Sequence, residues 1–516
     1  MRSYTNTLGT LVPAAILAFT CLATATADDP GYRHTDPSAA SVSHPQYLVP
    51  EAEPVAVESA SLTTPTAAQP QPRPRYKPKP APKPYKGVFY NNDFSYLEDP
   101  CNDQCYLGDV LKRNRIGCRT VLDIGGEYRM RHMSEDLFNR NDYLLHRTRL
   151  YTNLEIGDAF RVYGEGIDAV SEFEDVPPRP IDENRLDVLN LFADAKLVEA
   201  DRGDLWFRFG RQELLYGAQR LISPLDWANT RRTFDGANFI WEGQNWRADT
   251  FVTRPVSLWQ HLPATDHNFD NPDQSQEFSG IYLTRKGLKN KSLDVYFLRY
   301  TDDDGIRDFS PDFEYNTIGA RLAGNYCNWL WEIEGAYQFG DYADLDHSAG
   351  FYTLGAGRKL AKLPWNTDFW VYYDWASGDS DPNDGTNGTF NQLFPLGHKY
   401  FGWMDIIGRQ NIEDLNVRIT TSPHERVKLI LWYHVFHLQQ ARDALYNPLS
   451  APVRRDPTGA AGQNVGQELD MAVDITLTPR VNLLFGYCHF YTGSFINNTG
   501  GIDGEDFYFG QMSCRF

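Results

Sequence analysis

The chain has 516 residues, a formal net charge of −19 and a mean hydropathy of −0.50, and 14% of its residues are aromatic. Beyond the N-terminus it has no apolar run of about 18 residues, which excludes helical membrane spans. A low mean hydropathy does not exclude a β-barrel, because only alternate residues of its strands are apolar. The aromatic content fits the interface girdles of a barrel, and equally an aromatic-rich secreted β-sandwich or propeller.

Residues 1–27 predict a secretory signal peptide. Arg2 supplies the positive start, an apolar core runs over 8–19, and Ala25-Thr26-Ala27 is a small-x-small cleavage site. We expect cleavage near Ala27. Six of the seven cysteines then remain, in an oxidising compartment where disulfide pairing is favoured.

Residues 28–86 predict a disordered, Pro-rich periplasmic linker, because they hold few large apolar residues. The segment ends in a basic polyproline tract at 69–84, which forms an extended and stiff spacer. This tract is either a solvated tether or a contact with an anionic cell-wall polymer. It is too short and too rich in proline to indicate nucleic-acid binding.

Residues 87–118 predict a small cysteine-containing segment with Cys101, Cys105 and Cys118. A disulfide among these three is favoured by the compartment, and the spacing does not say which two pair. A metal site is the weaker alternative, because no fourth ligand is evident. We predict no bound metal and no cofactor.

Apolar and polar residues alternate along most of the chain from 119 to 516. Thr148 and Leu150, for example, alternate with Arg147 and Arg149, which is the period of an extended strand. The pattern predicts about eighteen strands, near 119–132, 143–156, 158–170, 188–199, 203–212, 234–243, 245–254, 277–286, 291–300, 313–323, 328–339, 350–359, 366–377, 412–421, 426–437, 467–477, 480–491 and 506–516. The expected fold class is all-β, a transmembrane antiparallel β-barrel.

Three features favour a membrane barrel over a soluble sandwich. The polar strand faces carry charges of both signs, which suits a water-filled lumen with the apolar faces against outer-membrane lipid. Short turns such as 157–158 and 478–479 alternate with long connections such as 377–412, as periplasmic turns alternate with external loops. The chain also ends in a terminal aromatic, Phe516. We therefore expect location in the outer membrane.

The block 210–236 is unusually apolar and arginine-rich for a connection between strands. A loop that folds back into the lumen explains this composition. Arginine binds carboxylates through a bidentate fork, so the loop is either self-satisfied by internal ion pairs or has guanidinium groups left for an anionic ligand. The residues concerned are Arg211, Arg220, Arg231 and Arg232, with Glu213, Asp226 and Asp235 as the internal partners.

This block resembles the alginate export family of outer-membrane barrels. The matching features are G-R-Q-E-L-x-Y-G from 210, R-L-I-S from 220 and D-W-x-N-x-R-R-T-F-D-G from 226. The resemblance covers about 119–516, with a specific motif only at 210–236. It implies a barrel that passes a polyanionic polysaccharide through an arginine-lined constriction.

The polar strand faces independently predict an arginine-rich pore, and rings of arginine select anions. We expect the path of an anionic polysaccharide or oligosaccharide to be lined by Arg129, Arg131, Arg147, Arg149, Arg208, Arg211, Arg220, Asp226, Arg231, Arg232, Asp235, Arg321 and Arg418. Acidic residues share those faces, so a general diffusion porin is the main alternative. A barrel that anchors the outer membrane to the wall through 28–86 is the third.

Enzymatic activity is not expected. The sequence has no G-x-S-x-G nucleophile motif, and the spacing of its carboxylates does not single out a glycosidase pair. The segment 379–385 is similar to a calcium loop, but its glycine is one position late and Phe390 stands where the loop needs glutamate. A flexible external loop is the favoured interpretation of this segment.

Overall fold

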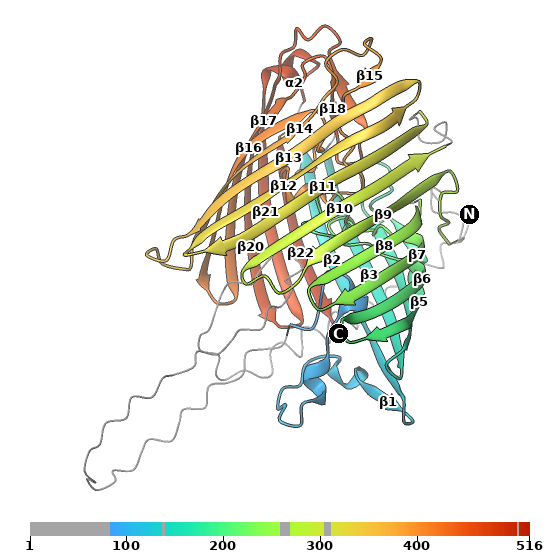
Figure 1. The fold of residues 1–516 in the computed structure, drawn as a ribbon. Coiled ribbons are helices and arrows are strands. Elements are labelled where there is room, and N and C mark those ends of the chain that lie inside the picture. The colour runs from blue at the N-terminus through green and yellow to red at the C-terminus, as the bar shows by residue number, and fades with distance from the viewer. Residues whose placement is uncertain (1–82, 137–139, 258–268, 304–310, 503–504) are drawn as a thin grey trace, which may run out of the picture.

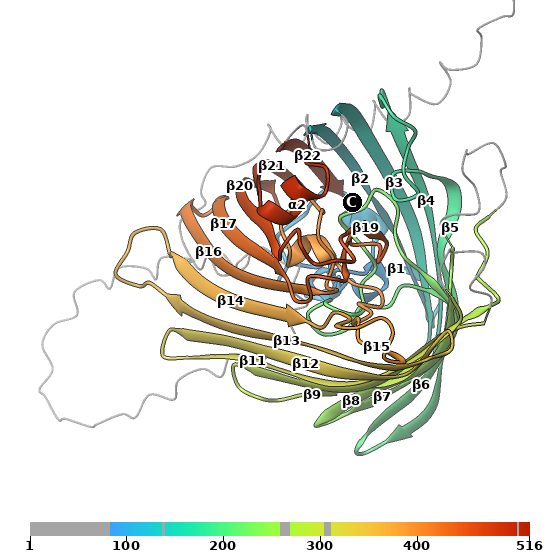
Figure 2. The same cartoon turned by 90° about the horizontal axis from the view of Figure 1, so that it is seen from above.

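The computed structural model describes residues 83–136, 140–257, 269–303, 311–502 and 505–516 (Figure 1). The predicted signal peptide and nearly all of the predicted linker lie outside the described residues. Within the described ranges the chain forms a closed barrel of eighteen long antiparallel strands (Figures 1 and 2). The barrel closes where the last strand, β22 (Asp506–Arg515), pairs with the first, β2 (Thr120–Asp136).

Each of the other barrel strands pairs with its neighbours along the chain. They are β3 (Arg140–Ile156), β4 (Phe160–Glu172), β5 (Asn184–Ala200), β6 (Gly203–Gln212), β7 (Phe234–Gly243), β8 (Trp246–Pro255), β9 (Gln276–Arg285), β10 (Lys291–Asp302), β11 (Phe313–Tyr326), β12 (Trp329–Tyr342), β13 (Leu345–Lys359), β14 (Asp368–Ala376), β16 (Ile412–His424), β17 (Val427–Leu438), β20 (Asn464–Thr478) and β21 (Val481–Thr492). Every strand overlaps one predicted range, which confirms the predicted fold class.

Alternation along the strands separates a polar interior from an apolar exterior, as a membrane barrel requires. On β3, Arg147 and Arg149 are each 1% exposed, whereas Leu150 is 54% exposed on the opposite face. The same outward exposure recurs in apolar residues of other strands, among them Phe209, Ile318, Leu354, Leu415 and Phe485. No helix in the described ranges is long and apolar enough to cross a membrane.

The connections differ in length between the two ends of the barrel. The end that holds the C-terminus carries short turns, including 157–159 between β3 and β4 and 479–480 between β20 and β21 (Figure 1). The other end carries the long connections, including 213–233, 377–411 and 439–463. This asymmetry places the short-turn end on the periplasmic side.

Residues 83–118 form a segment at the short-turn mouth, below the barrel in Figure 1. Its short elements are η1 (Phe89–Asn91), η2 (Ser95–Glu98), η3 (Asp109–Leu111) and β1 (Asn114–Ile116). Phe89 packs edge-on against Tyr151 at 5.8 Å between ring centroids, and Asp109 forms an ion pair with Arg480 at 2.8 Å. The segment thus caps the periplasmic mouth and shares an aromatic cluster with the barrel wall.

The disulfide expected in this segment is not formed. Cys101, Cys105 and Cys118 are exposed free thiols. The segment is instead held by its aromatic cluster and by its bonds to the barrel, so the covalent bond inferred from the compartment is not needed for its placement. In the described part of the chain, no group of three or more potential ligand residues is arranged to hold a metal ion.

Two long connections fold into the barrel instead of projecting from it. Residues 213–233 are largely buried, as their composition predicts. The prediction that 377–412 is an external loop is wrong for 388–411, which is also largely buried and includes η4 (Gly397–Lys399). Its apolar side chains, such as Phe401 and Ile407, join the main hydrophobic cluster. Only its first part, around 380–385, is exposed as expected.

The remaining short elements belong to the long connections. They are β15 (Thr386–Asn387), β18 (Ala444–Tyr446), β19 (Pro452–Arg455) and α2 (Ser494–Asn498). In the view along the barrel, α2, β19 and β15 lie within the outline of the strands (Figure 2). The long-loop end is therefore covered by chain, and the two inward loops lie beneath this cover.

Candidate functional site

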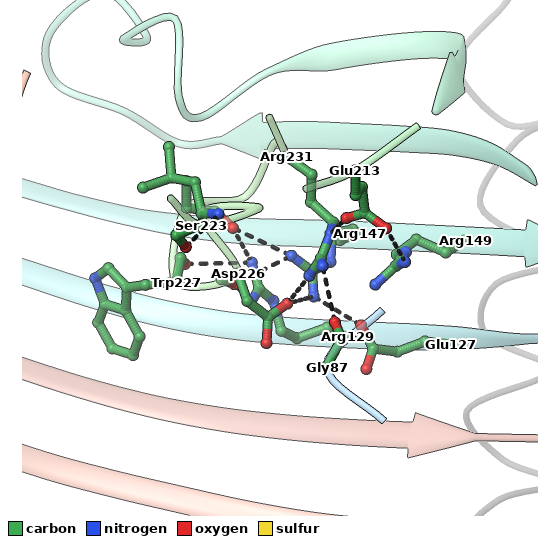
Figure 3. Close-up of polar contacts among 12 residues, drawn as sticks. Gly87, Glu127, Arg129, Arg147, Arg149, Glu213, Ser223, Asp226, Trp227 and Arg231 are labelled. Atoms are coloured by element: carbon green, nitrogen blue, oxygen red, sulfur yellow. Dashed lines mark hydrogen bonds and ion pairs between the residues drawn. The ribbon is translucent and has the colours of Figure 1, made fainter. Parts of the chain in front are cut away.

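Four buried arginines on β2 and β3 face the inner loop 213–233, and Figure 3 shows three of them, Arg129, Arg147 and Arg149. Strand register places Arg129 opposite Arg147 and Glu127 opposite Arg149. Alternation puts all of these side chains on the inner face, because they are separated by two residues along each strand. They form one continuous polar patch, here called the arginine wall, which consists of Arg129, Arg131, Arg147, Arg149 and Glu127.

Arg231 ties the inner loop together. Its guanidinium lies between the carboxylates of Glu213 and Asp226, and its side chain is completely buried. A third bond runs from Arg231 Nη2 to the carbonyl oxygen of Gly87, at 3.0 Å. Arg231 therefore connects the inner loop with the segment that caps the mouth (Figure 3).

Asp226 is the acidic centre of this network. It accepts a bond from Arg147 Nη2 at 3.0 Å in addition to the contact with Arg231. Burial alone would raise the pKa of Asp226, but Arg231, Arg147 and Arg129 hold it well below its usual value. The aspartate is therefore charged at neutral pH and neutralises part of the arginine wall.

Most charges of the wall are paired. Arg149 forms an ion pair with Glu165 at 2.7 Å, and Arg147 forms one with Glu127 at 2.7 Å. Arg515, near the end of the chain, also binds Glu127, at 2.8 Å. These groups of the barrel wall are therefore neutralised by ion pairs with one another.

Arg129 and Arg131 differ from their neighbours, because within the described residues no carboxylate forms an ion pair with either. Arg129 donates to the carbonyl oxygens of Asp226 and Ala228, at 2.7 and 2.5 Å. Arg131 donates to Gln511 Oε1 and to the carbonyl oxygen of Trp227, both at 2.7 Å. Asp226 acts on both guanidinium groups but is already paired with Arg147 and Arg231, so it offsets their charge only in part and these two residues leave an excess of positive charge.

Aromatic stacking extends from the arginine wall across the barrel. The Arg131 guanidinium lies 3.7 Å from the ring centroid of Trp227, which stacks on His398 at 3.7 Å. Farther along the same inward loop, Trp403 and Met404 donate their backbone N–H groups to Asp470 and Glu468 on β20, at 3.3 and 3.0 Å. The two inward loops thus bridge an arginine-rich wall and an acidic wall.

A second buried cluster lies on β11, β12 and β14. Arg220 of the inner loop binds Glu332 at 2.9 Å and Glu334 at 2.8 Å, and Arg321 shares Glu332 at 3.0 Å. Arg409, which was not among the predicted residues, binds Asp374 at 2.6 Å. Arg409 lies in an apolar stretch of the sequence. The same combination of arginine and apolar residues predicts the inward loop at 210–236.

The other predicted site residues lie apart from the arginine wall. Arg208 binds Asp194 near the periplasmic mouth, and Arg211 binds Asp235, each through two bonds. Arg418 stacks on Trp432 at 5.2 Å and, in the described part of the chain, forms no ion pair. The predicted residues therefore form several clusters instead of one ring.

Arg232 has a different environment from its neighbour Arg231. It donates to the carbonyl oxygens of Ser223 and Pro395, at 3.4 and 3.2 Å, and burial lowers its pKa to about 10. It therefore stays charged at neutral pH. Its role is to connect the two inward loops through neutral acceptors.

Lys399 gives the inward loop 388–411 a pH dependence. Its Nζ lies 3.1 Å from the carbonyl oxygen of Ala218, and burial lowers its pKa from 10.5 to about 7, with Glu332 opposing and Arg220 reinforcing the shift. The unfolded chain therefore binds more protons than the folded chain between about pH 7 and 10.5, so stability rises with pH across this window.

We expect the variant Lys399→Met to remove this part of the pH dependence. The measurement is the denaturant midpoint of unfolding at pH 6.5, 8 and 10 for wild type and variant. The wild-type midpoint should rise with pH relative to that of Lys399→Met. Parallel pH profiles for the two proteins would contradict the assignment.

Comparison with known proteins decides the family. The family model described as alginate export matches residues 120–509, which is most of the barrel. The chain belongs to the alginate export family. Among curated proteins, none matches the sequence.

Solved barrel structures resemble this member of the alginate export family in fold. A BenF-like porin from Pseudomonas fluorescens Pf-5 has a TM-score of 0.51 and 11% identity, over 77% of this chain and 98% of that one. OccD3 (OpdP) from Pseudomonas aeruginosa has a TM-score of 0.51 and 10% identity, over 76% and 91%. Family and fold together show a non-enzymatic channel of the outer membrane.

Proposed function

We propose that this alginate export family barrel conducts an anionic polysaccharide or oligosaccharide across the outer membrane. The observation that carries the proposal is the excess of positive charge at Arg129 and Arg131, whose hydrogen bonds within the described residues go to neutral acceptors. Family membership supports the same class of substrate. The family match alone does not specify which polymer passes.

The mechanism is electrostatic. Fixed guanidinium groups replace the counterions of the polyanion along the arginine wall, in a path that is partly shielded from bulk water. Binding at each group has to be weak, since conduction requires that the polymer also leaves. The paired arginines, such as Arg147 with Glu127, shape the wall and hold the inner loop without binding substrate strongly.

Transport requires the two inward loops to shift, because they bridge the lumen in the described conformation. Some bonds between them and the walls are side-chain contacts to backbone carbonyls, for instance from Arg129 to Asp226. Others are buried ion pairs, from Arg220 to Glu332 and Glu334 and from Arg409 to Asp374. The carbonyl contacts break more easily than the ion pairs, since no unpaired carboxylate is left behind. Movement of the loops therefore requires these ion pairs to break as well.

A general porin for small solutes is the second candidate function. It is favoured by the many internal ion pairs, among them Arg220 with Glu332 and Glu334, which leave few guanidinium groups free. Wall anchoring through 28–86 stays a prediction, because almost all of that tract lies outside the described residues.

Current block in a planar bilayer separates the two channel functions. We expect an oligouronate added on the periplasmic side to reduce the current through the full chain at micromolar to millimolar concentration. A polyethylene glycol of similar size is the neutral control and should block much less. Equal block by the two polymers would favour the general porin.

A further inference from the structure

A cavity of about 390 Å³ lies at the periplasmic mouth. Its walls come from the capping segment, through Val88 and Tyr90, from residues 213–216 of the inner loop, and from β3 to β8 of the barrel. The turn at Gly157 forms part of its rim, which places the opening on the short-turn side. The volume falls within the range of small-molecule sites.

Two amide side chains in this cavity have unused hydrogen-bonding groups. Gln212 is completely buried, and neither its Nε2 nor its Oε1 has a partner among the described residues. Asn238, 2% exposed, donates to the Tyr216 hydroxyl at 3.3 Å, but its Oδ1 has no partner. A buried polar group without a partner costs free energy, so this pair of amides is built for a ligand that both donates and accepts.

The charges of the cavity are already neutralised by one another. Asp194 accepts bonds from Arg208 at 2.7 Å and from Arg161 at 2.8 Å. Arg247 binds Asp249 at 2.7 Å and also contacts Glu242. Every arginine of the lining thus has a carboxylate partner, whereas the carboxylates of the lining outnumber the arginines, six to three. An anionic ligand would therefore find no arginine of this lining without a carboxylate partner, and the net negative charge of the lining would repel it.

The apolar part of the lining is aromatic. Tyr90, Trp206 and Tyr216 contribute to the wall, and the Tyr90 ring is itself fixed by the Arg208 guanidinium at 4.5 Å. Aromatic faces offer large contact area to the C–H faces of a ring. The amide groups can bind the hydroxyl groups of a sugar, and the aromatic faces can pack against its ring carbons. This combination suits an uncharged sugar.

We propose that this periplasmic cavity is a binding site for a neutral sugar of one or two rings. No residue of the arginine wall lines this cavity, although Glu213 of its lining lies 3.6 Å from Arg149. The site also differs in ligand charge, and it does not depend on which polymer the channel conducts. Since Val88 and Tyr90 form part of the wall, a bound sugar also stabilises the capping segment against the barrel.

Isothermal titration of the full chain in detergent tests the proposal, with cellobiose as the neutral probe and digalacturonate as an anionic probe of similar size. We expect cellobiose to bind in the millimolar range or tighter, and digalacturonate at least tenfold more weakly. Gln212→Leu removes both the donor and the acceptor of the Gln212 amide and should weaken cellobiose binding by roughly tenfold or more.

Gln244→Leu is the matched control, since Gln244 is an exposed amide at the same end of the barrel, outside the cavity. It should leave binding unchanged. If Gln212→Leu fails to fold, Trp206→Leu tests the same wall and should also weaken binding. Absence of cellobiose binding, equal binding of digalacturonate, or unchanged binding in the cavity variants would each overturn the proposal. Block of the current by oligouronate tests the proposed channel function in a separate experiment. The sugar site and the channel function can therefore fail independently.

Discussion

Replacing Arg231 by alanine is expected to lower the free energy of unfolding by about 3–5 kcal/mol. The guanidinium is completely buried between Glu213 and Asp226, and it also holds the carbonyl oxygen of Gly87. Its removal leaves the buried Glu213 carboxylate without its nearest positive charge, which is more costly than losing the ion pair itself. The variant should also loosen the inner loop and the capping segment together, since Arg231 binds both.

Denaturant unfolding of the purified barrel in detergent measures this effect. Arg232→Ala is the matched control, because Arg232 is the adjacent arginine and its guanidinium contacts carbonyl oxygens and the Phe394 ring, with no ion pair among the described residues. The control should cost less than half as much as Arg231→Ala. Bilayer recordings of Arg231→Ala should show larger and noisier currents. Equal stability losses in the two variants would show that the carboxylate network does not hold the loop.

The double variant Arg129→Gln, Arg131→Gln is expected to reduce anion selectivity by about fivefold or more, with a small effect on stability. A unit charge about 4 Å from a passing anion contributes about 1 kcal/mol even in water, which corresponds to roughly fivefold in permeability. Glutamine keeps hydrogen-bond donors for the carbonyl oxygens that both arginines bind. The expected change is therefore electrostatic.

Reversal potentials under a salt gradient provide the measurement. Arg299→Gln is the control, because Arg299 lies on the outward face of β10 with the exposed residues Val295 and Phe297. It removes one positive charge from the chain, against two in the double variant, without changing the lumen. An equal loss of selectivity in the control would mean that net charge, and not the arginine wall, sets the preference for anions.

The barrel could be predicted from the sequence because period-2 alternation is a local signal. Each strand has an apolar face and a polar face whatever its neighbours are, so eighteen strands and the inward side of Arg147 and Arg149 follow from the pattern. The inner loop 213–233 was also predictable, since an arginine-rich and apolar connection is poorly suited to the outside of a barrel.

The partners within the lumen could not be predicted in this way. Glu127 and Arg515 meet only because the first and last strands pair, although 388 positions separate them in the sequence. The length and polar flanks of 377–412 predict an external loop and give no sign of the inward fold of 388–411. Its buried residues Phe401 and Ile407 carried the contrary signal.

The capping segment shows a further limit. Cysteine spacing and compartment predicted a disulfide, whereas the structure holds the segment by aromatic packing at Phe89 and by the ion pair between Asp109 and Arg480. The sequence shows that the segment is rich in aromatic residues, but it does not show which ring of the barrel wall each of them contacts. The contacts arise from the closed barrel, which brings Tyr151 under the segment.

The central claim is that the excess of guanidinium charge at Arg129 and Arg131 makes this channel prefer anions. The most direct measurement is the reversal potential of the wild-type full chain in a planar bilayer under a potassium chloride gradient at pH 8. The account predicts a potential of the sign set by chloride, and an anion preference that declines at high salt as the fixed charges are screened. A potential of the sign set by potassium, or one near zero at low salt, would contradict it.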